Sequence, residues 1–359
     1  MTSAFDEVTF EHGPAMKNRF MLAPLTNEQS HADGTLSEDE YRWLTYRAKG
    51  GFGLTMTCAS HVQAVGQGFR GQLGCFSDDH LPGLERLATG IKSFGSLAII
   101  QLHHAGRRSP KELIGQDPVA PCADGDTGAR ALSTAEVETL IHDFVAAAVR
   151  AERAGFDGVE LHAAHDYILC ELLNGTFNVR DDHYGGSLEN RMRALLEIID
   201  GVRTACRPDF NLSVRFSPER FGQATADIIE VYTRIVDGGK VDFIDLSMWD
   251  VFKEAADEEF DGRPLLDVFA ELDRGTVKMA VAGKLYHGAD VARALDGGAD
   301  IVAIGRAAIT NHNFPEILRA DPAAGMRELP VTRAMLAEEG LGESFIDYMS
   351  GWHGFVEQG

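Results

Sequence analysis

Eight short apolar runs of β type recur along the chain, and each is followed by a longer stretch with the apolar spacing of an amphipathic helix. The clearest helix is Thr134–Ala154, which Ser133 or Thr134 can cap and Gly155 ends. Parallel strands joined by helices must be covered on both faces, and eight such units predict a closed (β/α)8 TIM barrel. The predicted strands are Arg19–Ala23, Gly53–Thr57, Leu97–Leu102, Gly158–His162, Asn211–Phe216, Asp242–Ser247, Val277–Ala282 and Asp300–Ile304.

An open doubly wound sheet is the alternative fold for this alternation. Such a sheet carries G-x-G-x-x-G after its first strand, whereas the first strand here runs into Ala23-Pro24-Leu25-Thr26. We therefore expect a single domain, with a barrel over about residues 18–313 and a C-terminal extension over 314–359. The segment His103–Leu132 is rich in Gly, Pro and Asp and predicts an extended loop after the third strand.

The composition is that of a globular protein and excludes several classes of function. Of 359 residues, 44% are hydrophobic and 25% are charged, so the chain is neither disordered nor a disulfide scaffold. The formal charge of −22 repels polyanions, so nucleic acid is not an expected partner. The acidic start MTSAFDEVTF and the lack of eighteen consecutive apolar residues predict a cytoplasmic protein with no membrane segment. The five cysteines form no C-x-x-C ligand set for a metal or an iron–sulfur cluster.

The fourth predicted strand and its exit hold the most distinctive polar residues. Strand alternation points Glu160 and His162 to one side, and His165 follows within one turn, so both imidazoles can face the barrel mouth. Two neutral imidazoles can donate hydrogen bonds to one oxygen, and the phenol of Tyr167 can deliver a proton nearby. The alternative is that these are ordinary polar residues at the start of a helix.

Zinc binding is a second interpretation of the histidines, because His103, His104, His162 and His165 could be gathered as ligands. Adjacent His103 and His104 would point to opposite faces of a strand, and the chain contains neither H-x-H nor H-E-x-x-H. We therefore predict no metal site.

Arg215 lies at the end of the fifth predicted strand and points away from the face that Val214 and Phe216 share. An unpaired guanidinium in a barrel mouth would be costly, so Arg215 needs an anionic or carbonyl-rich partner. That partner is either a ligand or an internal carboxylate, of which Glu160 is the obvious candidate.

Glycine and a basic residue follow both of the last two predicted strands, as Gly283-Lys284 and Gly305-Arg306. Either the glycines only mark helix entry, or these loops bind a phosphorylated ligand, as loops after strands seven and eight of a barrel often do. Thr26 and Gln101, at the ends of strands one and three, could bind a planar heterocycle with several hydrogen-bonding atoms.

Six collinear motifs between Asn18 and Asn313 resemble the Old Yellow Enzyme family of FMN-dependent ene-reductases. The motifs lie at Asn18–Thr26, Ile100–Arg107, Ala154–Tyr167, Asn178–Arg191, Ser213–Ser217 and Ala299–Arg306. The resemblance implies a TIM barrel that holds FMN non-covalently. It also implies flavin contacts for Pro24, Leu25, Thr26, Ala59, Gln101, Arg215, Gly283, Gly305 and Arg306.

By the same resemblance, His162 and His165 hold the activating carbonyl of an enone or enal over the flavin, and Tyr167 protonates the α-carbon after hydride transfer. NADPH or NADH first reduces the flavin in the same pocket. The implied enzyme is an NAD(P)H-driven ene-reductase acting on a small activated alkene, either as a monomer or as a homo-oligomer. The alternatives are a flavin dehydrogenase or demethylase, a dienoyl-CoA reductase, or a metal-dependent barrel hydrolase.

Several features depart from the family pattern. Glu28 and His31 follow Thr26 where relatives often carry an aromatic substrate contact. Val179 stands where relatives commonly have lysine. Asp166 stands between His165 and Tyr167, where relatives usually have glycine, and its carboxylate either raises the pKa of a histidine or points to solvent. Residues 314–359 match the family poorly, so the sequence assigns no role in the site to C-terminal side chains such as Tyr348.

Overall fold

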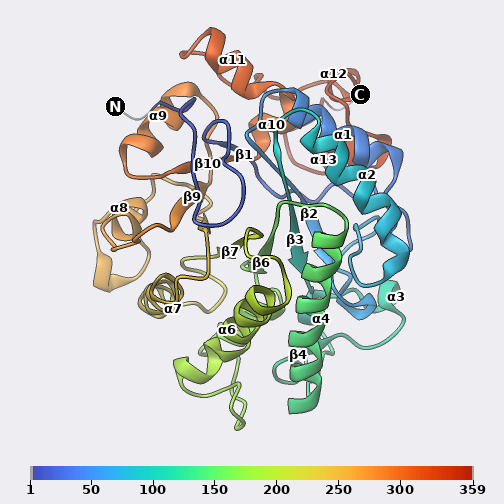
Figure 1. Cartoon of the computed structure of the whole chain (residues 1–359), viewed down its shortest axis with the longest axis vertical. Coiled ribbons are helices and arrows are strands. Elements are labelled where there is room, and N and C mark those ends of the chain that lie inside the picture. The colour runs from blue at the N-terminus through green and yellow to red at the C-terminus, as the bar shows by residue number, and fades with distance from the viewer. Residues whose placement is uncertain (1–2, 358–359) are drawn as a thin grey trace.

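The computed structural model of the protein describes residues 3–357 and contains a closed barrel of eight parallel strands (Figure 1). β1 pairs with β2 on one side and with β10 on the other, which closes the ring and rules out the open-sheet alternative. The predicted TIM barrel is therefore confirmed. The barrel strands are β1 (Phe20–Leu22), β2 (Leu54–His61), β3 (Leu97–His103), β6 (Gly158–Ala163), β7 (Asn211–Phe216), β8 (Phe243–Ser247), β9 (Lys278–Ala282) and β10 (Ile301–Ile304).

Helices follow the strands in alternation and surround the barrel (Figure 1). The helices between successive barrel strands are α1 (Glu38–Lys49), α2 (Leu81–Lys92), α4 (Thr134–Arg153), α6 (Leu188–Ala205), α7 (Thr225–Asp237), α8 (Leu265–Ala270) and α9 (Gly288–Asp296). The longest of them, α4, begins with the expected cap, because Ser133 and Glu136 exchange side-chain-to-backbone hydrogen bonds. Within residues 3–357, no helix is long and apolar enough to cross a membrane.

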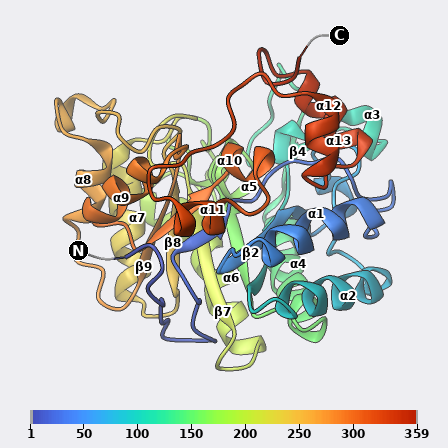
Figure 2. The same cartoon turned by 90° about the horizontal axis from the view of Figure 1, so that it is seen from above.

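The remaining elements lie in long loops and near the C-terminus. The loop after β3 contains α3 (Lys111–Ile114) and a small sheet of β4 (Val119–Ala120) and β5 (Arg130–Ala131). The other elements are α5 (Ile168–Leu173) after β6, α10 (Arg306–Thr310) after β10, then α11 (Phe314–Ala320), α12 (Arg333–Glu338) and α13 (Glu343–Ser350). α12 and α13 lie beside α1 (Figure 2), and the ring of Phe345 meets that of Trp43 edge-on, with 4.8 Å between centroids.

Two apolar cores lie on the two faces of the barrel strands. The larger core lies between the strands and the helices, and Val159 and Leu161 contribute to it from β6. The smaller core fills the barrel interior near the N-terminal ends of the strands, where Val8 and Met16 of the N-terminal segment join side chains such as Leu54. The N-terminal segment therefore closes the end of the barrel opposite the loops that follow the strands.

The barrel interior changes character toward the C-terminal ends of the strands. β9, β10 and β1 contribute the small side chains Ala282, Ala303 and Ala23. The inward-facing positions of β3, β6, β7 and β8 are instead polar and buried, and they are Gln101, Glu160, His162, Ser213, Arg215 and Asp245. The small apolar wall leaves open space opposite a polar wall at this end of the barrel.

Candidate active site

The loops and strand ends at the mouth of the barrel surround a cavity with two connected parts. One part has a volume of about 440 Å³ and includes Gly283, Gly305 and Arg306, and the other has a volume of about 400 Å³ and includes Gln101 and Tyr167. The residues that line both parts are Leu25, His165, Arg215, Trp249 and Trp352. The structure thus places every predicted site residue, including Pro24, Thr26, Ala59 and His162, around one cavity.

The register of the strands determines which polar side chains meet inside the barrel. Gln101, Glu160 and Ser213 are neighbours in register on β3, β6 and β7. Gln101 Nε2 donates to Glu160 Oε1 at 2.8 Å, and Ser213 Oγ donates to Glu160 Oε2 at 3.4 Å. Glu160 therefore fixes the orientation of the Gln101 carboxamide in the cavity wall.

Arg215 pairs with Asp245, so the expectation that Glu160 would be its internal partner is wrong. In the parallel register Arg215 lies next to His162 on one side and Asp245 on the other, and Glu160 is one inward-facing position lower. Arg215 Nε is 3.1 Å from Asp245 Oδ2, and both side chains are almost fully buried. The contact lacks hydrogen-bond geometry, and Arg215 Nε has no hydrogen-bond partner among the described residues. The guanidinium therefore has N–H donors available for a ligand in the cavity that it lines.

Two carboxyl groups are buried in this polar wall. Burial, followed by the charge of Asp245, raises the pKa of Glu160 to about 8. Burial also raises the pKa of Asp245, although the charge of Arg215 acts in the opposite direction. Glu160 therefore carries a proton at neutral pH, and Asp245 supplies the charge that balances Arg215.

His162 and His165 stand side by side at the mouth, with ring centroids 5.1 Å apart. The backbone N–H of Ala164 donates to His162 Nδ1 at 3.3 Å, so the neutral ring of His162 carries its proton on Nε2. His165 Nε2 and Ser247 Oγ lie 2.7 Å apart. Burial is the main cause that holds the pKa of both imidazoles well below its ordinary value, with smaller contributions from neighbouring histidines for His162 and from Arg215 and Arg108 for both. Both rings are therefore neutral at pH 7 and can donate a hydrogen bond.

Tyr167 lies on the same side of the cavity as the two histidines, which sequence spacing alone could not establish. Its ring centroid is 5.0 Å from that of His162 and 4.2 Å from that of His103. The guanidinium of Arg108 lies 4.9 Å from the centroid of the tyrosine ring. Burial raises the pKa of the Tyr167 phenol, so its O–H is retained at neutral pH.

Of the four histidines considered as zinc ligands, His103, His162 and His165 lie around Tyr167, whereas His104 packs elsewhere. His103 faces Tyr167 in the barrel mouth, whereas the ring of His104 lies against Gly66, where an added Cβ would come within 2.5 Å of it. His104 Nδ1 also accepts the backbone N–H of Gly106 at 3.0 Å. Among residues 3–357, no group of three or more His, Cys, Asp or Glu side chains is arranged to hold a metal ion.

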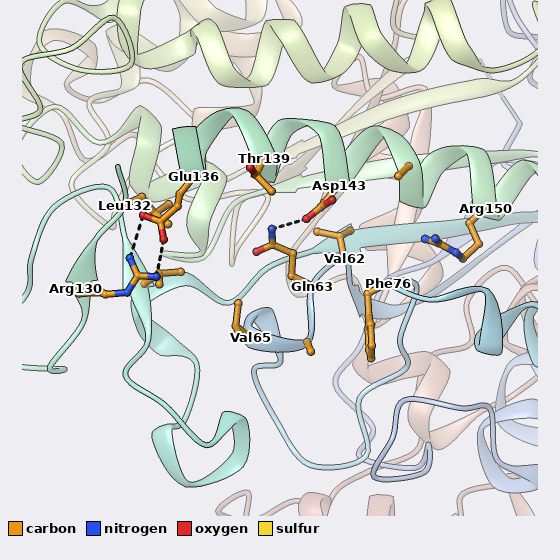
Figure 3. Close-up of a pocket in the computed structure, with 13 residues that line it drawn as sticks. Val62, Gln63, Val65, Phe76, Arg130, Leu132, Glu136, Thr139, Asp143 and Arg150 are labelled. Atoms are coloured by element: carbon orange, nitrogen blue, oxygen red, sulfur yellow. Dashed lines mark hydrogen bonds and ion pairs between the residues drawn. The ribbon is translucent and has the colours of Figure 1, made fainter. Parts of the chain in front are cut away.

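A second hollow, of about 430 Å³, lies along α4 and shares no residue with the cavity at the mouth (Figure 3). Its polar side chains already bind one another, since Arg130 Nη2 donates to Glu136 at 2.7 Å and Gln63 Nε2 donates to Asp143 at 2.6 Å. The barrel mouth, where polar groups remain available, is therefore the candidate active site.

Residues 5–322 match the model of the NADH:flavin oxidoreductase / NADH oxidase family. The chain belongs to this family. It is 33% identical over 320 residues to the probable NADH-dependent flavin oxidoreductase YqiG of Bacillus subtilis, with 86% of each chain covered. It is 34% identical over 315 residues to an NADPH dehydrogenase of Bacillus pumilus, with 85% of this chain and 90% of that protein covered.

The fold agrees with this assignment. The structure of the Old Yellow Enzyme homologue from Zymomonas mobilis superposes with a TM-score of 0.80 at 26% identity, covering 97% of this chain and 99% of that one. The chain spans about a third of the length of several longer relatives. The protein is thus an FMN-dependent NAD(P)H oxidoreductase of the Old Yellow Enzyme family.

The part of the cavity near β9 and β10 has the chemistry that an FMN phosphate needs. Gly283 has a φ of 150°, and an added Cβ there would lie 2.6 Å from the Trp249 backbone, so the close approach of these loops requires glycine. Gly305 faces open space, since an added Cβ would meet only Leu25, at 3.7 Å. Arg306 is exposed and has no carboxylate partner within the described part of the chain. Two accessible glycine loops and an unpaired cation fit a phosphate group.

The other part of the cavity fits the flavin ring. Arg215 Nε is a buried donor without a hydrogen-bond partner among residues 3–357, and the Gln101 carboxamide, which lines the same part of the cavity, is held in one orientation. Leu25 and Ala59 supply apolar lining. A planar heterocycle with several acceptors along one edge matches this combination of donors and apolar surface.

Asp166 takes neither of the positions expected from the sequence. Its carboxylate forms a bidentate ion pair with Arg107, whose Nη2 lies 2.7 Å from Oδ1 and 2.8 Å from Oδ2. His165 and Asp166 both adopt the left-handed backbone region, with φ of 61° and 60°. The ion pair therefore ties the strained loop that carries Tyr167 to the loop after β3.

Several cavity residues are not evident from the sequence. They are Arg108, Phe221 and Trp249 from the loops after β3, β7 and β8, and Tyr348, Met349 and Trp352 from α13 and the turn after it. Trp352 lies near the cofactor end of the cavity, 5.3 Å from the guanidinium of Arg306. Strand and helix periodicity did not place these residues in the cavity, and the only sequence signal is that Phe221, Trp249, Tyr348 and Trp352 are aromatic.

Proposed function

We propose that the protein is an NAD(P)H-dependent ene-reductase that reduces the activated C=C bond of a small enone or enal. The observation that carries this proposal is the position of Tyr167 beside two neutral imidazoles, in the same cavity as the groups that fit FMN. A carbonyl-activating pair next to a proton donor is the arrangement that reduction of a conjugated alkene requires.

In this proposal, His162 and His165 bind the carbonyl oxygen of the substrate. Ala164 fixes the tautomer of His162 so that Nε2–H is the donor, and Ser247 holds the ring of His165 in place. Because both rings are neutral, they polarise the carbonyl as hydrogen-bond donors without adding a charge to the cavity.

Tyr167 supplies the proton. Bound FMN supplies hydride, which it receives from NADPH or NADH. The raised pKa of Tyr167 keeps its proton on the phenol at neutral pH, and the phenol then donates that proton to the α-carbon of the substrate.

The cofactor contacts are part of the same proposal. Arg215 and Gln101 bind the polar edge of the flavin, and the charge of Arg215 stabilises negative charge on that edge. Arg306 binds the phosphate. The full proposed set of flavin contacts is Pro24, Leu25, Thr26, Ala59, Gln101, Arg215, Gly283, Gly305 and Arg306.

Anaerobic spectroscopy of the purified protein tests the proposal. We expect flavin absorbance bands that bleach when NADPH or NADH is added and return when 2-cyclohexenone follows. Bleaching that the enone does not reverse, while another electron acceptor does, would disprove the ene-reductase function and leave a flavin oxidoreductase with a different acceptor.

A further inference from the structure

The charges around the cavity mouth do not balance. Three carboxylates at the mouth are each bound to a neighbouring cation, in the pairs Arg215–Asp245, Arg107–Asp166 and Lys284–Asp250. Glu28, from the loop after β1, interacts with the charge of Arg70. The cavity-lining cations Arg108, Arg220 and Arg306 form no ion pair with any residue in the range 3–357. The mouth therefore carries surplus positive charge, although the chain as a whole has a formal charge of −22.

Arg108 is directed toward the residues that we propose to act on the substrate. It is exposed and lines the same part of the cavity as His162 and Tyr167. Its Nη1 donates to the backbone carbonyl of His165 at 2.6 Å, and the guanidinium lies over the ring of Tyr167. A guanidinium has five N–H donors, so most of them remain available to a bound molecule.

Arg220, from the loop after β7, lines the part of the cavity that contains Gly283 and Arg306. It is exposed, its guanidinium lies 4.4 Å from the ring centroid of Trp249, and that ring is 6.3 Å from the ring of His165. Arg220 and Trp249 both have positive φ, at 73° and 64°. Both residues thus adopt a backbone conformation that is rare for non-glycine residues, and the contact between Arg220 and Trp249 holds the unpaired guanidinium at the cavity.

The groups that the sequence and the cavity assign to the FMN phosphate do not include Arg108 or Arg220. The groups that fit that phosphate are Gly283, Gly305 and Arg306, which lie at the other end of the cavity from Tyr167. Arg108 lines the part of the cavity that contains Tyr167 and donates to the backbone carbonyl of His165. Arg220 lines the other part, and its guanidinium lies over Trp249, which borders both parts and is 6.3 Å from the ring of His165.

We propose that Arg108 and Arg220 form an anion-binding rim that recognises a carboxylate or phosphate on the molecule bound over the flavin. This inference rests on the proposed function and narrows its substrate class. The anionic group belongs either to the activated alkene or to the nicotinamide nucleotide, since both use the same cavity. Attraction at the rim overcomes the repulsion that the acidic surface exerts on such molecules.

Rapid-mixing measurements of the two half-reactions test the rim in Arg108→Gln, Arg220→Gln and the double variant. For flavin reoxidation, 2-cyclohexenone is compared with a cyclohexenone that carries a carboxylate. For flavin reduction, NADPH and NADH are compared with neutral N-benzyl-1,4-dihydronicotinamide. Arg234→Gln is the matched control, because Arg234 is an exposed arginine in the last turn of α7, outside the cavity.

In one half-reaction, we expect the variants to lower the rate constant for the anionic probe, relative to that for the neutral probe, about tenfold. This is the effect of losing one charge-assisted hydrogen bond. The half-reaction affected identifies the carrier of the anionic group. The preference of the unmodified protein for that anionic probe should also weaken at high ionic strength. The neutral probes report any displacement of Tyr167 or His165 that loss of the Arg108 side chain causes.

If the arginine variants change the rate constants for the anionic and neutral probes equally in both half-reactions, the proposed anion-binding rim is wrong. Failure of the proposed function has a different signature, since neither cyclohexenone would then reoxidise the flavin of the unmodified protein. The reductive half-reaction would still test the rim in that case.

Discussion

Strained backbone is concentrated at the mouth of the barrel. Within residues 3–357, the non-glycine residues with positive φ all lie in loops that follow barrel strands, and they are Glu28, His165, Asp166, Arg220, Phe221, Trp249 and Lys284. Most of them line the cavity. Such conformations persist only where surrounding contacts enforce them, and here the contacts include the Arg107–Asp166 ion pair and the stacking of Arg220 on Trp249. The same contacts position the residues proposed to act in catalysis.

Replacing Tyr167 by Phe removes the proposed proton donor and keeps the ring that packs against His103. We expect flavin reoxidation by 2-cyclohexenone to slow by about 100-fold or more, the usual contribution of a general acid. Flavin reduction by NADPH or NADH should be unchanged, because it needs no proton from this phenol. Stopped-flow measurement of both half-reactions checks the prediction. Tyr232→Phe is the control, since it removes a buried hydroxyl outside the cavity, and equal reoxidation rates in Tyr167→Phe and Tyr232→Phe would contradict the assignment.

Glu160 makes stability depend on pH in a direction opposite to that of a salt-bridged carboxylate. Its pKa is about 8 in the folded protein against about 4.5 when exposed, so the folded state binds the extra proton between these values. Its contribution to stability is complete below pH 4.5 and is lost as the pH rises through about 8. Glu160→Gln keeps an acceptor for Gln101 but cannot ionise. We expect its melting temperature to fall less than that of the unmodified protein between pH 5 and pH 8, and parallel curves would contradict this.

At the scale of elements, Arg107 joins two loops and the helix α5 at the mouth. Its side chain binds Asp166 after β6 and reaches Asp124, in the loop between β4 and β5, at 3.4 Å. Its backbone N–H donates to Glu171 Oε1, on α5, at 2.9 Å. The position of Tyr167, immediately after Asp166, therefore depends on contacts between the loops that follow β3 and β6.

Two substitutions of Asp166 separate the ion pair from the backbone strain. Asn tolerates the left-handed region but cannot form the ion pair, whereas Ala has neither property. We expect melting temperatures to decrease from the unmodified protein to Asp166→Asn to Asp166→Ala, with about 1–3 kcal/mol lost in the last. Both variants should slow flavin reoxidation, which uses Tyr167, more than flavin reduction. Calorimetry and stopped-flow measurements check this, and unchanged reoxidation in Asp166→Ala would show that the pair does not position Tyr167.

The sequence allowed the strands and the inward faces to be predicted, because apolar and polar residues alternate along β6 and β7. It did not reveal the neighbour of Arg215. The pairing register depends on the stagger of the closed barrel, and this stagger places Asp245 beside Arg215 and Glu160 beside Gln101. Gly283 and Gly305 could be placed at the barrel mouth in advance because they follow directly on strands.

Residues of the long loops and of the C-terminus could not be placed in advance. Trp249 lines the cavity from a turn in which its own backbone is left-handed. Trp352 lines it from the C-terminal segment, which the packing of Phe345 on Trp43 holds against α1. Local sequence contains no period that would report these contacts. The pairing of Asp166 with Arg107 could not be predicted either, because the two residues come from different loops.

At the scale of the whole molecule, the two ends of the chain complete opposite ends of the barrel. The N-terminal segment, with Val8 and Met16, closes the end where the strands begin. The C-terminal segment brings Tyr348 and Trp352 over the mouth, where Trp352 meets Arg306. A cofactor bound in the cavity would therefore contact strand ends, loops and the C-terminal segment together, so its binding should be coupled to the stability of the whole domain.

Removal of FMN should destabilise the protein, and the phosphate contacts should determine by how much. A ligand present at 100 times its Kd stabilises the folded state by about 2.7 kcal/mol, so we expect added FMN to raise the melting temperature of the apoprotein by several degrees. Arg306→Ala removes the unpaired cation of the phosphate end and should weaken FMN binding at least tenfold, which reduces this increase at a fixed FMN concentration. Arg234→Ala is the control, with the same change in net charge outside the cavity. Melting curves recorded across a range of FMN concentrations check both statements. An FMN-dependent increase that is the same in Arg306→Ala as in Arg234→Ala would mean that the phosphate binds elsewhere in the cavity.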